Sequence, residues 1–370
     1  MCETAMKQDE YTTRRFTSHD QQQELDVDLL TPYSQLPNLS DIKIKIPAHC
    51  FRSTVRKSMF YVTLDIFIIL ASYIVMIQLE HKLKYGILFF LFTGTLYMAL
   101  FSIGHDCTHA SFSNYSLLND TIGTIVFTWI LIPYFPWKLT HKNHHKNTGN
   151  MEKDEAFCPQ RDGIYEESIM NDFFLWTPGL SWFHYLVNGY APRYVSHFNP
   201  FEIIFEKHII KISISLGVYV TMLYLMFLYA IHVGIISLIV HHLIPVFVFA
   251  TYFVVVTLLH HTEMDVPWFV NSEWNYIKGQ LSTVDRHYGH VHGIIHSIGT
   301  HQIHHLFPKV PHYNLEEATF HFRKAFPNLV RFNNDRILSS FVRMGKKFIR
   351  QRFIGKDISV FTYSNDQDDK

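Results

Sequence analysis

The chain has 370 residues, 48% of them hydrophobic and 16% aromatic, and its 32 basic residues balance its 32 acidic ones. The chain therefore has no basic excess that would indicate nucleic-acid binding, and no block of like charges indicates an interaction tail. The four cysteines show no CxxC spacing and no disulfide framework, whereas the 25 histidines are an excess that calls for an explanation, because imidazole is the commonest metal ligand.

Four long apolar segments follow a polar N-terminal arm that has no apolar core of a secretory signal. Each approaches the roughly 20 residues that cross a bilayer. We therefore predict four transmembrane helices in two hairpins, over about 59–79, 86–103, 212–231 and 241–260. A further apolar segment, 121–136, contains Pro133 and Pro136, and we expect it to be interfacial or re-entrant.

The long loop between the second and third spans and the C-terminal region are separated by an even number of spans, so they face the same side. Both regions are rich in lysine and arginine, which places them in the cytosol by the positive-inside rule. Lys82 and Lys84 in the first short loop argue mildly the other way.

Three clusters of histidine lie in these cytosolic regions. They read HDCTH, HKNHH and HQIHH, and comprise His105, His109, His141, His144, His145, His301, His304 and His305. Spacings of i, i+3 and i+4 place the members of each cluster on one helix face, from which their rings can point at a common centre. We expect them to ligate metal.

The residue types narrow the choice of metal site. One zinc ion takes only three or four protein ligands, and the chain has neither the HExxH of zincins nor the Glu-x-x-His of carboxylate-bridged di-iron bundles. Imidazole suits iron, copper and zinc. Two irons, each with four or five histidines, would use this number of rings.

These clusters and their flanks, GHDCTHASFS, PYFPWKLTHKNHHKNTGN and IGTHQIHHLFPKVPHYNLEEAT, resemble the membrane fatty acid desaturases, and most closely the methyl-end (Δ12 and omega-3) acyl desaturases. The resemblance covers about residues 46–330. It implies an all-α integral membrane fold with a cytosolic, histidine-rich helical cap. The domain division would be a disordered arm at 1–45, a desaturase domain at 46–335 and a basic, then polar, cytosolic tail at 336–370.

The resemblance also implies the chemistry. Two iron ions with O2 as co-substrate would place a cis double bond in a membrane-lipid or acyl-CoA substrate, with electrons from a separate cytochrome b5 and its reductase. It implies a multi-pass protein of the endoplasmic reticulum and leaves a homodimer open. Asp106 and the IGTHQIHHLFP stretch are similar to the omega-3 branch, whereas Thr108 replaces the usual glycine.

A further ligand is implied near the end of the fourth span, where we choose His261 over His260. His296 is a second candidate. His241 and His242 lie about 27 Å from His260 along one helix, so we interpret them as lumenal caps. Asp106, Asp154, Glu155, Asp285 and Arg286 would either orient ligands or form ordinary loop ion pairs.

The leading hypothesis is omega-3 desaturation of n-6 C18–C20 acyl chains. A Δ12 desaturase, or a hydroxylase, epoxygenase or acetylenase on the same scaffold, remains open, as does a metal transporter. Trp129, Tyr134 and Trp137 would either line the acyl tunnel or anchor their segment at the interface.

Overall fold

A computed structural model describes residues 36–79, 83–155, 158–161, 169–190 and 193–364. The first half contains α2 (Leu39–Lys43), η2 (Ala48–Phe51), α3 (Val55–Leu79), α4 (Leu83–His109), α5 (Ser116–Trp129), α6 (Tyr134–Asn147), β1 (Gln160–Arg161), α7 (Ile169–Trp176) and α8 (Pro178–Asn188). The second half contains η3 (Ile203–His208), α9 (Ile209–His232), α10 (Ile235–Leu238), the π-helical η4 (Ile239–Leu243), α11 (Ile244–His261), β2 (Trp268–Phe269), α12 (Tyr276–Leu281), β3 (Asp285–Arg286), η5 (Gly289–Val291), α13 (His301–Leu306), α14 (His312–Ala325), η6 (Pro327–Leu329), β4 (Phe332–Asn333), α15 (Ile337–Arg350), β5 (Phe353–Ile354) and β6 (Val360–Phe361).

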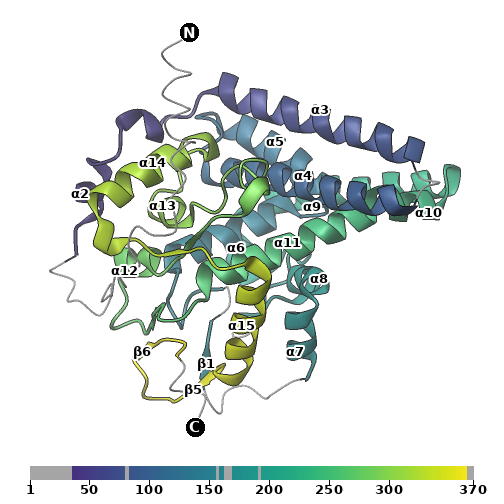
Figure 1. Ribbon diagram of the computed structural model, residues 1–370. Coiled ribbons are helices and arrows are strands. Elements are labelled where there is room, and N and C mark those ends of the chain that lie inside the picture. The colour runs from purple at the N-terminus through teal and green to yellow at the C-terminus, as the bar shows by residue number, and fades with distance from the viewer. Residues whose placement is uncertain (1–35, 80–82, 156–157, 162–168, 191–192, 365–370) are drawn as a thin grey trace.

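Four helical segments among the described residues are long and apolar enough to cross a membrane, which confirms the predicted all-α membrane architecture. They are Val55–Gln78, Gly86–His109, Ile203–His232 and Ile235–His261. The long helices run together toward one side of the molecule in Figure 1. α4 and α11 pack against each other in the middle, whereas α3 and α9 expose apolar side chains such as Phe67 and Ile210, as expected of helices that face lipid.

The segment between the second and third spans is broken, as the two prolines suggested. α5 and α6 meet at an angle of 104°. Leu131 has a positive φ of 59° at the bend, and Pro133 precedes the first residue of α6. Pro136 lies in the first turn of α6, where a backbone N–H would have no partner within the helix, so this proline does not interrupt it. The bend turns α6 back toward the ends of α4 and α11.

A cap of short elements covers the ends of α4, α6 and α11 (Figure 1). Its apolar core joins η2, α12, α13 and α14 and includes Ile42, Phe307 and Phe322. Three two-stranded pairings tie in distant segments: β1 with β5 and β3 with β4 are parallel, and β2 with β6 is antiparallel.

The two terminal regions differ from the simple arm and tail of the expected division. Residues 39–43 form α2, which Asn38 and Asp41 close as a capping box, and Ile42 is fully buried. The 336–370 region packs α15 against α11 and pairs β5 and β6 with earlier strands, so its described part belongs to the folded body. Residues 1–35, the larger part of the expected arm, lie outside the described residues.

Candidate metal centre and apolar pocket

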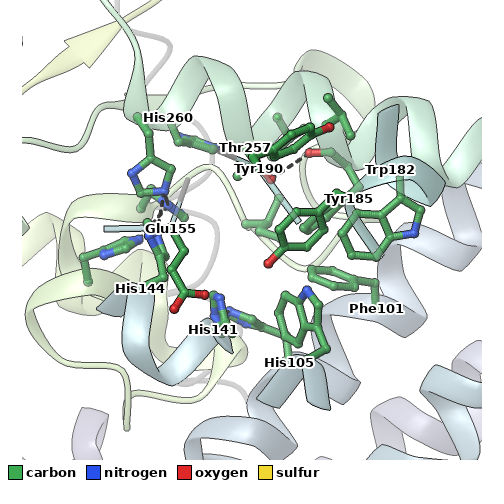
Figure 2. A pocket seen from close by; sticks show the side chains of 18 residues that line it. Phe101, His105, His141, His144, Glu155, Trp182, Tyr185, Tyr190, Thr257 and His260 are labelled. Atoms are coloured by element: carbon green, nitrogen blue, oxygen red, sulfur yellow. Dashed lines mark hydrogen bonds between the residues drawn. The ribbon is translucent and has the colours of Figure 1, made fainter. Parts of the chain in front are cut away.

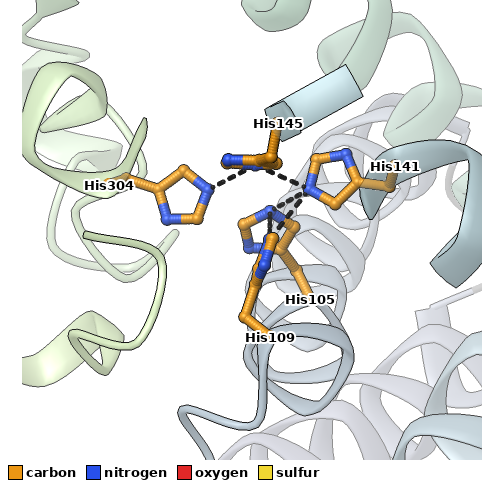
Figure 3. Close-up of side chains that lie close together, drawn as sticks. All are labelled: His105, His109, His141, His145 and His304. Atoms are coloured by element: carbon orange, nitrogen blue, oxygen red, sulfur yellow. Dashed lines mark hydrogen bonds between the residues drawn. The ribbon is translucent and has the colours of Figure 1, made fainter. Parts of the chain in front are cut away.

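Five histidines from α4, α6 and α13 form the first group of ring nitrogens: His105, His109, His141, His145 and His304. The Nε2 atom of His141 lies 2.7 Å from that of His105 and 3.0 Å from that of His109. The Nε2 atom of His145 lies 3.1 Å from both its His141 and His304 counterparts. Figure 3 shows these rings pointing toward one another from three helices.

The second group contains His144, His261 and His305, and His301 joins it. The Nε2 atom of His261 lies 3.3 Å from that of His144 and 3.0 Å from that of His301. The same atom of His301 lies 2.9 Å from that of His305. Both groups therefore converge through Nε2, and α6 and α13 each contribute to both of them.

Hydrogen bonds to Nδ1 hold two of these rings in place. His144 Nδ1 donates to Asp154 Oδ1 at 2.6 Å, and Asp154 is fully buried. The Nδ1 atom of His305 lies 3.1 Å from both Gln280 Oε1 and Thr148 Oγ1. A proton held on Nδ1 leaves the Nε2 lone pair directed at the centre, as metal ligation requires.

Electrostatics keep the cap histidines neutral. Burial, followed by repulsion from neighbouring imidazoles, holds the pKa values of His301, His304 and His305 well below their usual range. A neutral imidazole offers a lone pair to a metal, whereas a protonated ring cannot bind one.

The donor set fits a pair of metal ions. The ring nitrogens of each group lie close together, buried and turned toward one another rather than toward protein acceptors. Within the two groups the Nε2 atoms face other imidazole nitrogens, at 2.7–3.3 Å. Lone pairs that converge in this way are satisfied together by a cation placed between them.

The other two candidate histidines, His260 and His296, have protein partners of their own and belong to neither group. His260 Nδ1 donates to the carbonyl oxygen of Val284 at 2.5 Å, and its Nε2 lies 3.0 Å from the Tyr288 hydroxyl, so its ring is used for support. His296 is not brought into either group, because its Nε2 is bonded to Asp65 Oδ2 at 2.7 Å.

The pair His241 and His242 does not cap a helix at a membrane surface. Both side chains are buried, and His242 Nδ1 lies 3.1 Å from the hydroxyls of Tyr73 and Tyr97. The expectation of lumenal caps is therefore wrong. The distance along the helix was counted correctly, but the packing of α3 against α4 supplies tyrosines at that depth, which the sequence did not reveal.

The acidic and basic residues singled out near the clusters have distinct roles. Asp106 accepts a hydrogen bond from His312 Nδ1 at 2.8 Å and so joins α4 to α14. Asp285 accepts from Arg323 at 2.8 Å. Arg286 pairs with Glu263. Only Asp154 contacts a ring of the two groups directly.

An apolar pocket opens onto both groups of rings. Its walls come from α4, α6, α8 and α11, and its lining includes His105, His141, His261 and His301 at one end and Phe101, Trp182 and Phe253 along the sides. Figure 2 shows the aromatic rings facing the histidines across this space. An apolar cavity that ends at polar groups suits a long apolar chain.

Of the three aromatic residues expected either to line the acyl tunnel or to anchor their segment at the interface, the structure places one at the pocket. Trp137 lines the pocket and stacks on His141, with ring centroids 4.3 Å apart. Tyr134 lies within 3.3 Å of Asp120 Oδ1, and Trp129 packs on His242. The pocket lining therefore includes Trp137 and neither of the other two.

Several supporting residues were missed from the sequence. Gln280, Thr148 and Asp65 contact histidine rings, yet they lie in stretches without any distinctive spacing. Thr148 follows His144 by four residues and therefore lies on the same helix face, a signal that could have been used.

A family model for fatty acid desaturases matches residues 84–333. The chain belongs to the fatty acid desaturase family. It is thus an oxidoreductase and a multi-pass membrane protein, and its two histidine groups agree with a di-metal site.

Relatives narrow the similarity further. The chain is 39% identical over 294 residues to an sn-1 acyl-lipid omega-3 desaturase (ferredoxin) of Nostoc sp., which covers 77% of this chain and 80% of that protein. It is 37% identical over 288 residues to an endoplasmic reticulum omega-3 fatty acid desaturase of Nicotiana tabacum, covering 76% of each. An acyl-lipid omega-3 desaturase (cytochrome b5) of Arabidopsis thaliana is 36% identical over 300 residues, covering 78% of this chain and 76% of the relative. The electron donor named for these relatives thus varies at similar identity.

Proposed function

We propose that this desaturase is an omega-3 enzyme that places a cis double bond near the methyl end of n-6 C18–C20 acyl chains. The observation that carries the proposal is the apolar pocket that runs between aromatic side chains and ends against both groups of histidine rings. Omega-3 relatives at 36–39% identity over most of the chain support the regiochemistry.

The proposed ligands are the rings of the two groups, with His261 as the one that lies outside the three clusters. Iron suits such an all-nitrogen set. Two bound iron ions would supply the oxidising power for removing hydrogen atoms from neighbouring methylenes with O2. Metal analysis of the purified protein should then find two iron ions per chain.

The protein's own part is to hold the substrate and exclude water. Phe101, Trp182 and Phe253 would press on the acyl chain and fix one carbon–carbon bond beside the rings, because precise positioning is itself worth several kcal/mol. The buried walls of the pocket keep water away from the reacting carbons. No general acid or base is required on the substrate.

Expression in a yeast that makes no polyunsaturated fatty acids tests the proposal directly. The cells are fed linoleic and arachidonic acids, and their fatty acids are profiled by gas chromatography–mass spectrometry. New omega-3 products should form with the wild type, vanish with His144→Ala and persist with the exposed control His208→Ala. A Δ12 product from endogenous oleate would move the protein to the other methyl-end branch, and hydroxylated or epoxidised chains would make it a hydroxylase or epoxygenase.

A separate cytochrome b5 in the endoplasmic reticulum is the proposed electron donor. Lys142 and Lys146 support a docking surface, because they are exposed on α6, next to His141 and His145. The tail residues Lys347 and Arg352 offer less, since both are buried and hydrogen-bonded. Acidic partners are attracted by such a basic face over about a Debye length.

Charge reversal separates this donor site from lipid binding. The double variant Lys142→Glu, Lys146→Glu should raise the KM for cytochrome b5 and flatten or reverse the dependence of this KM on salt, because the screened attraction is lost. Lys346→Glu, at an exposed position of α15, should change neither quantity. An unchanged KM, or faster turnover with ferredoxin than with cytochrome b5, would contradict the proposed donor.

A further inference from the structure

A third group of metal-binding side chains lies on the cap, separate from the two histidine groups. It consists of His49 and Cys50 in η2 and Glu317 in α14, whose ligand atoms lie within 4.8 Å of one another. The Nε2 atom of His49 is 3.0 Å from Glu317 Oε2 and 3.8 Å from Cys50 Sγ. We propose that these three residues form a second metal site, which takes a zinc-like divalent cation.

The spacing of the donor atoms matches four-coordinate zinc. With zinc bonds of about 2.0–2.3 Å to nitrogen, oxygen and sulfur, tetrahedral geometry separates nitrogen from oxygen by about 3.3 Å and nitrogen from sulfur by about 3.6 Å. The two measured distances lie within a few tenths of an ångström of these values. Small rotations of the exposed His49 and Glu317 side chains would complete the geometry, leaving a fourth position for water.

The backbone beneath the ligands is held in place before any cation binds. Asn314, one helical turn before Glu317 on α14, directs its side-chain amide at the carbonyl oxygens of His49 and Cys50, at 3.4 and 3.3 Å. Cys50 is fully buried and forms no disulfide, whereas the His49 side chain is 61% exposed. The site is therefore fixed on its inner side and open to the cation on its outer side.

The donor chemistry selects the ion. A thiolate, an imidazole and a carboxylate together favour zinc or cobalt, because sulfur is a poor ligand for magnesium and calcium. Two anionic ligands neutralise the charge of the ion. Lys57 lies above the ring of Tyr313, 4.2 Å from the ring centroid, and its positive charge favours the thiolate form of Cys50 that a metal binds.

Cobalt gives a readout that the histidine groups cannot produce. Sulfur bound to Co2+ absorbs strongly in the near ultraviolet, and no cysteine belongs to either histidine group. Iron-loaded holoenzyme in detergent is titrated with Co2+. The wild type should show one equivalent of sulfur-to-cobalt absorption, and excess Zn2+ should abolish it.

Matched variants decide the assignment. Cys50→Ser should remove the absorption and Glu317→Gln should weaken binding at least tenfold, whereas Cys158→Ser should keep the wild-type signal. Iron content and desaturation should be retained by Glu317→Gln, which shows that the variant is folded. No near-ultraviolet absorption in the wild type, or an equal signal in Cys50→Ser, would overturn the proposal.

Discussion

Asp154 is the residue whose contact with the metal centre is most direct among the charged neighbours. Its Oδ1 atom accepts from His144 Nδ1 and from the backbone N–H of Glu155, and its Oδ2 atom accepts from Gly149 N–H. The carboxylate therefore fixes both the tautomer and the orientation of His144 while it shapes the turn after α6.

Replacing Asp154 should reduce desaturation through the metal. We expect Asp154→Ala to lower product formation by about 10- to 100-fold, which is the usual cost of losing a partner of a metal-ligating histidine. Asp154→Asn should recover part of the activity, because its amide oxygen still accepts the Nδ1–H bond. Product yield and iron content should fall together, and Asp357→Ala, on an exposed loop, is the control. Full activity in Asp154→Ala would contradict this role.

Glu155 should make the stability of the metal-free protein depend on pH. Burial raises the pKa of its carboxyl group from 4.5 to about 7, against a 2.5 Å hydrogen bond from Asn143 that favours the charged form. A raised folded-state pKa stabilises the protonated form, so its contribution is complete below pH 4.5 and is lost as the pH rises toward 7.

Glu155→Gln should consequently melt a few degrees higher than the wild type at pH 8, and this gap should shrink toward pH 5. The measurement is thermal unfolding of chelator-treated protein in detergent. A gap that is independent of pH would show that Glu155 does not titrate in this range.

At the residue scale, the sequence predicted the histidines that recur at helical spacing, but it did not reveal contacts between residues that are far apart in the chain. Eight of the nine rings in the two groups come from the three clusters, whose i, i+3 and i+4 spacing places them on shared helix faces. His261 needed the family resemblance, and its neighbour His260 is separated from it only by the helical rotation of about 100° per residue. His296 shows the limit: its bond to Asp65 joins residues that are 231 positions apart.

Gly104 governs the contact between α4 and α5. A β-carbon at this position would lie 2.2 Å from the ring of Phe127 and 2.9 Å from Val126. The next residue is His105, so the closeness of the two helices also sets the position of a ring in the first group. The sequence placed both helices but gave no measure of how closely they approach.

The variant Gly104→Ala should therefore destabilise the protein, by about 1–3 kcal/mol as in other overpacked cores. Gly217→Ala on α9, where nothing lies within 4 Å of the added carbon, is the matched control and should be neutral or slightly stabilising. Thermal unfolding and iron content report the two effects. Equal melting temperatures for both variants would show that α5 moves aside at little cost.

Helix boundaries were predicted least well at the ends that carry function. The second span was expected to stop before His105, but α4 continues to His109 and carries the first cluster in its last turns. Apolar composition marks where lipid ends, whereas a helix continues as long as its polar residues have partners. The bend at Leu131 followed from the two prolines, although the 104° angle did not.

Across the whole molecule, the two histidine groups join four helices that are distant in the chain: α4, α6, α11 and α13. Metal binding should therefore stabilise the fold as a unit, since a ligand that binds only the folded state adds to its stability. We expect chelation to lower the melting temperature and abolish activity, and Fe2+ to restore both.

His301→Ala is the informative comparison for chelation. Having lost one ring of the second group, it should show a smaller difference between loaded and chelated forms than the wild type. A melting temperature that does not respond to chelation would mean that the cap and the membrane helices hold these rings together without metal.

Because His144 belongs to one group while His141 and His145 belong to the other, a single helix spans both centres. α13 does the same, with His304 in one group and His301 and His305 in the other. The distance between the two groups is thus set by the geometry of the α-helix, which rises by about 1.5 Å and turns by about 100° per residue. One residue inserted within either cluster would swing half of its rings by more than a quarter-turn. Loops outside these two helices can therefore change in length, whereas a change in the spacing of the histidines along α6 or α13 would disrupt both groups and with them the activity.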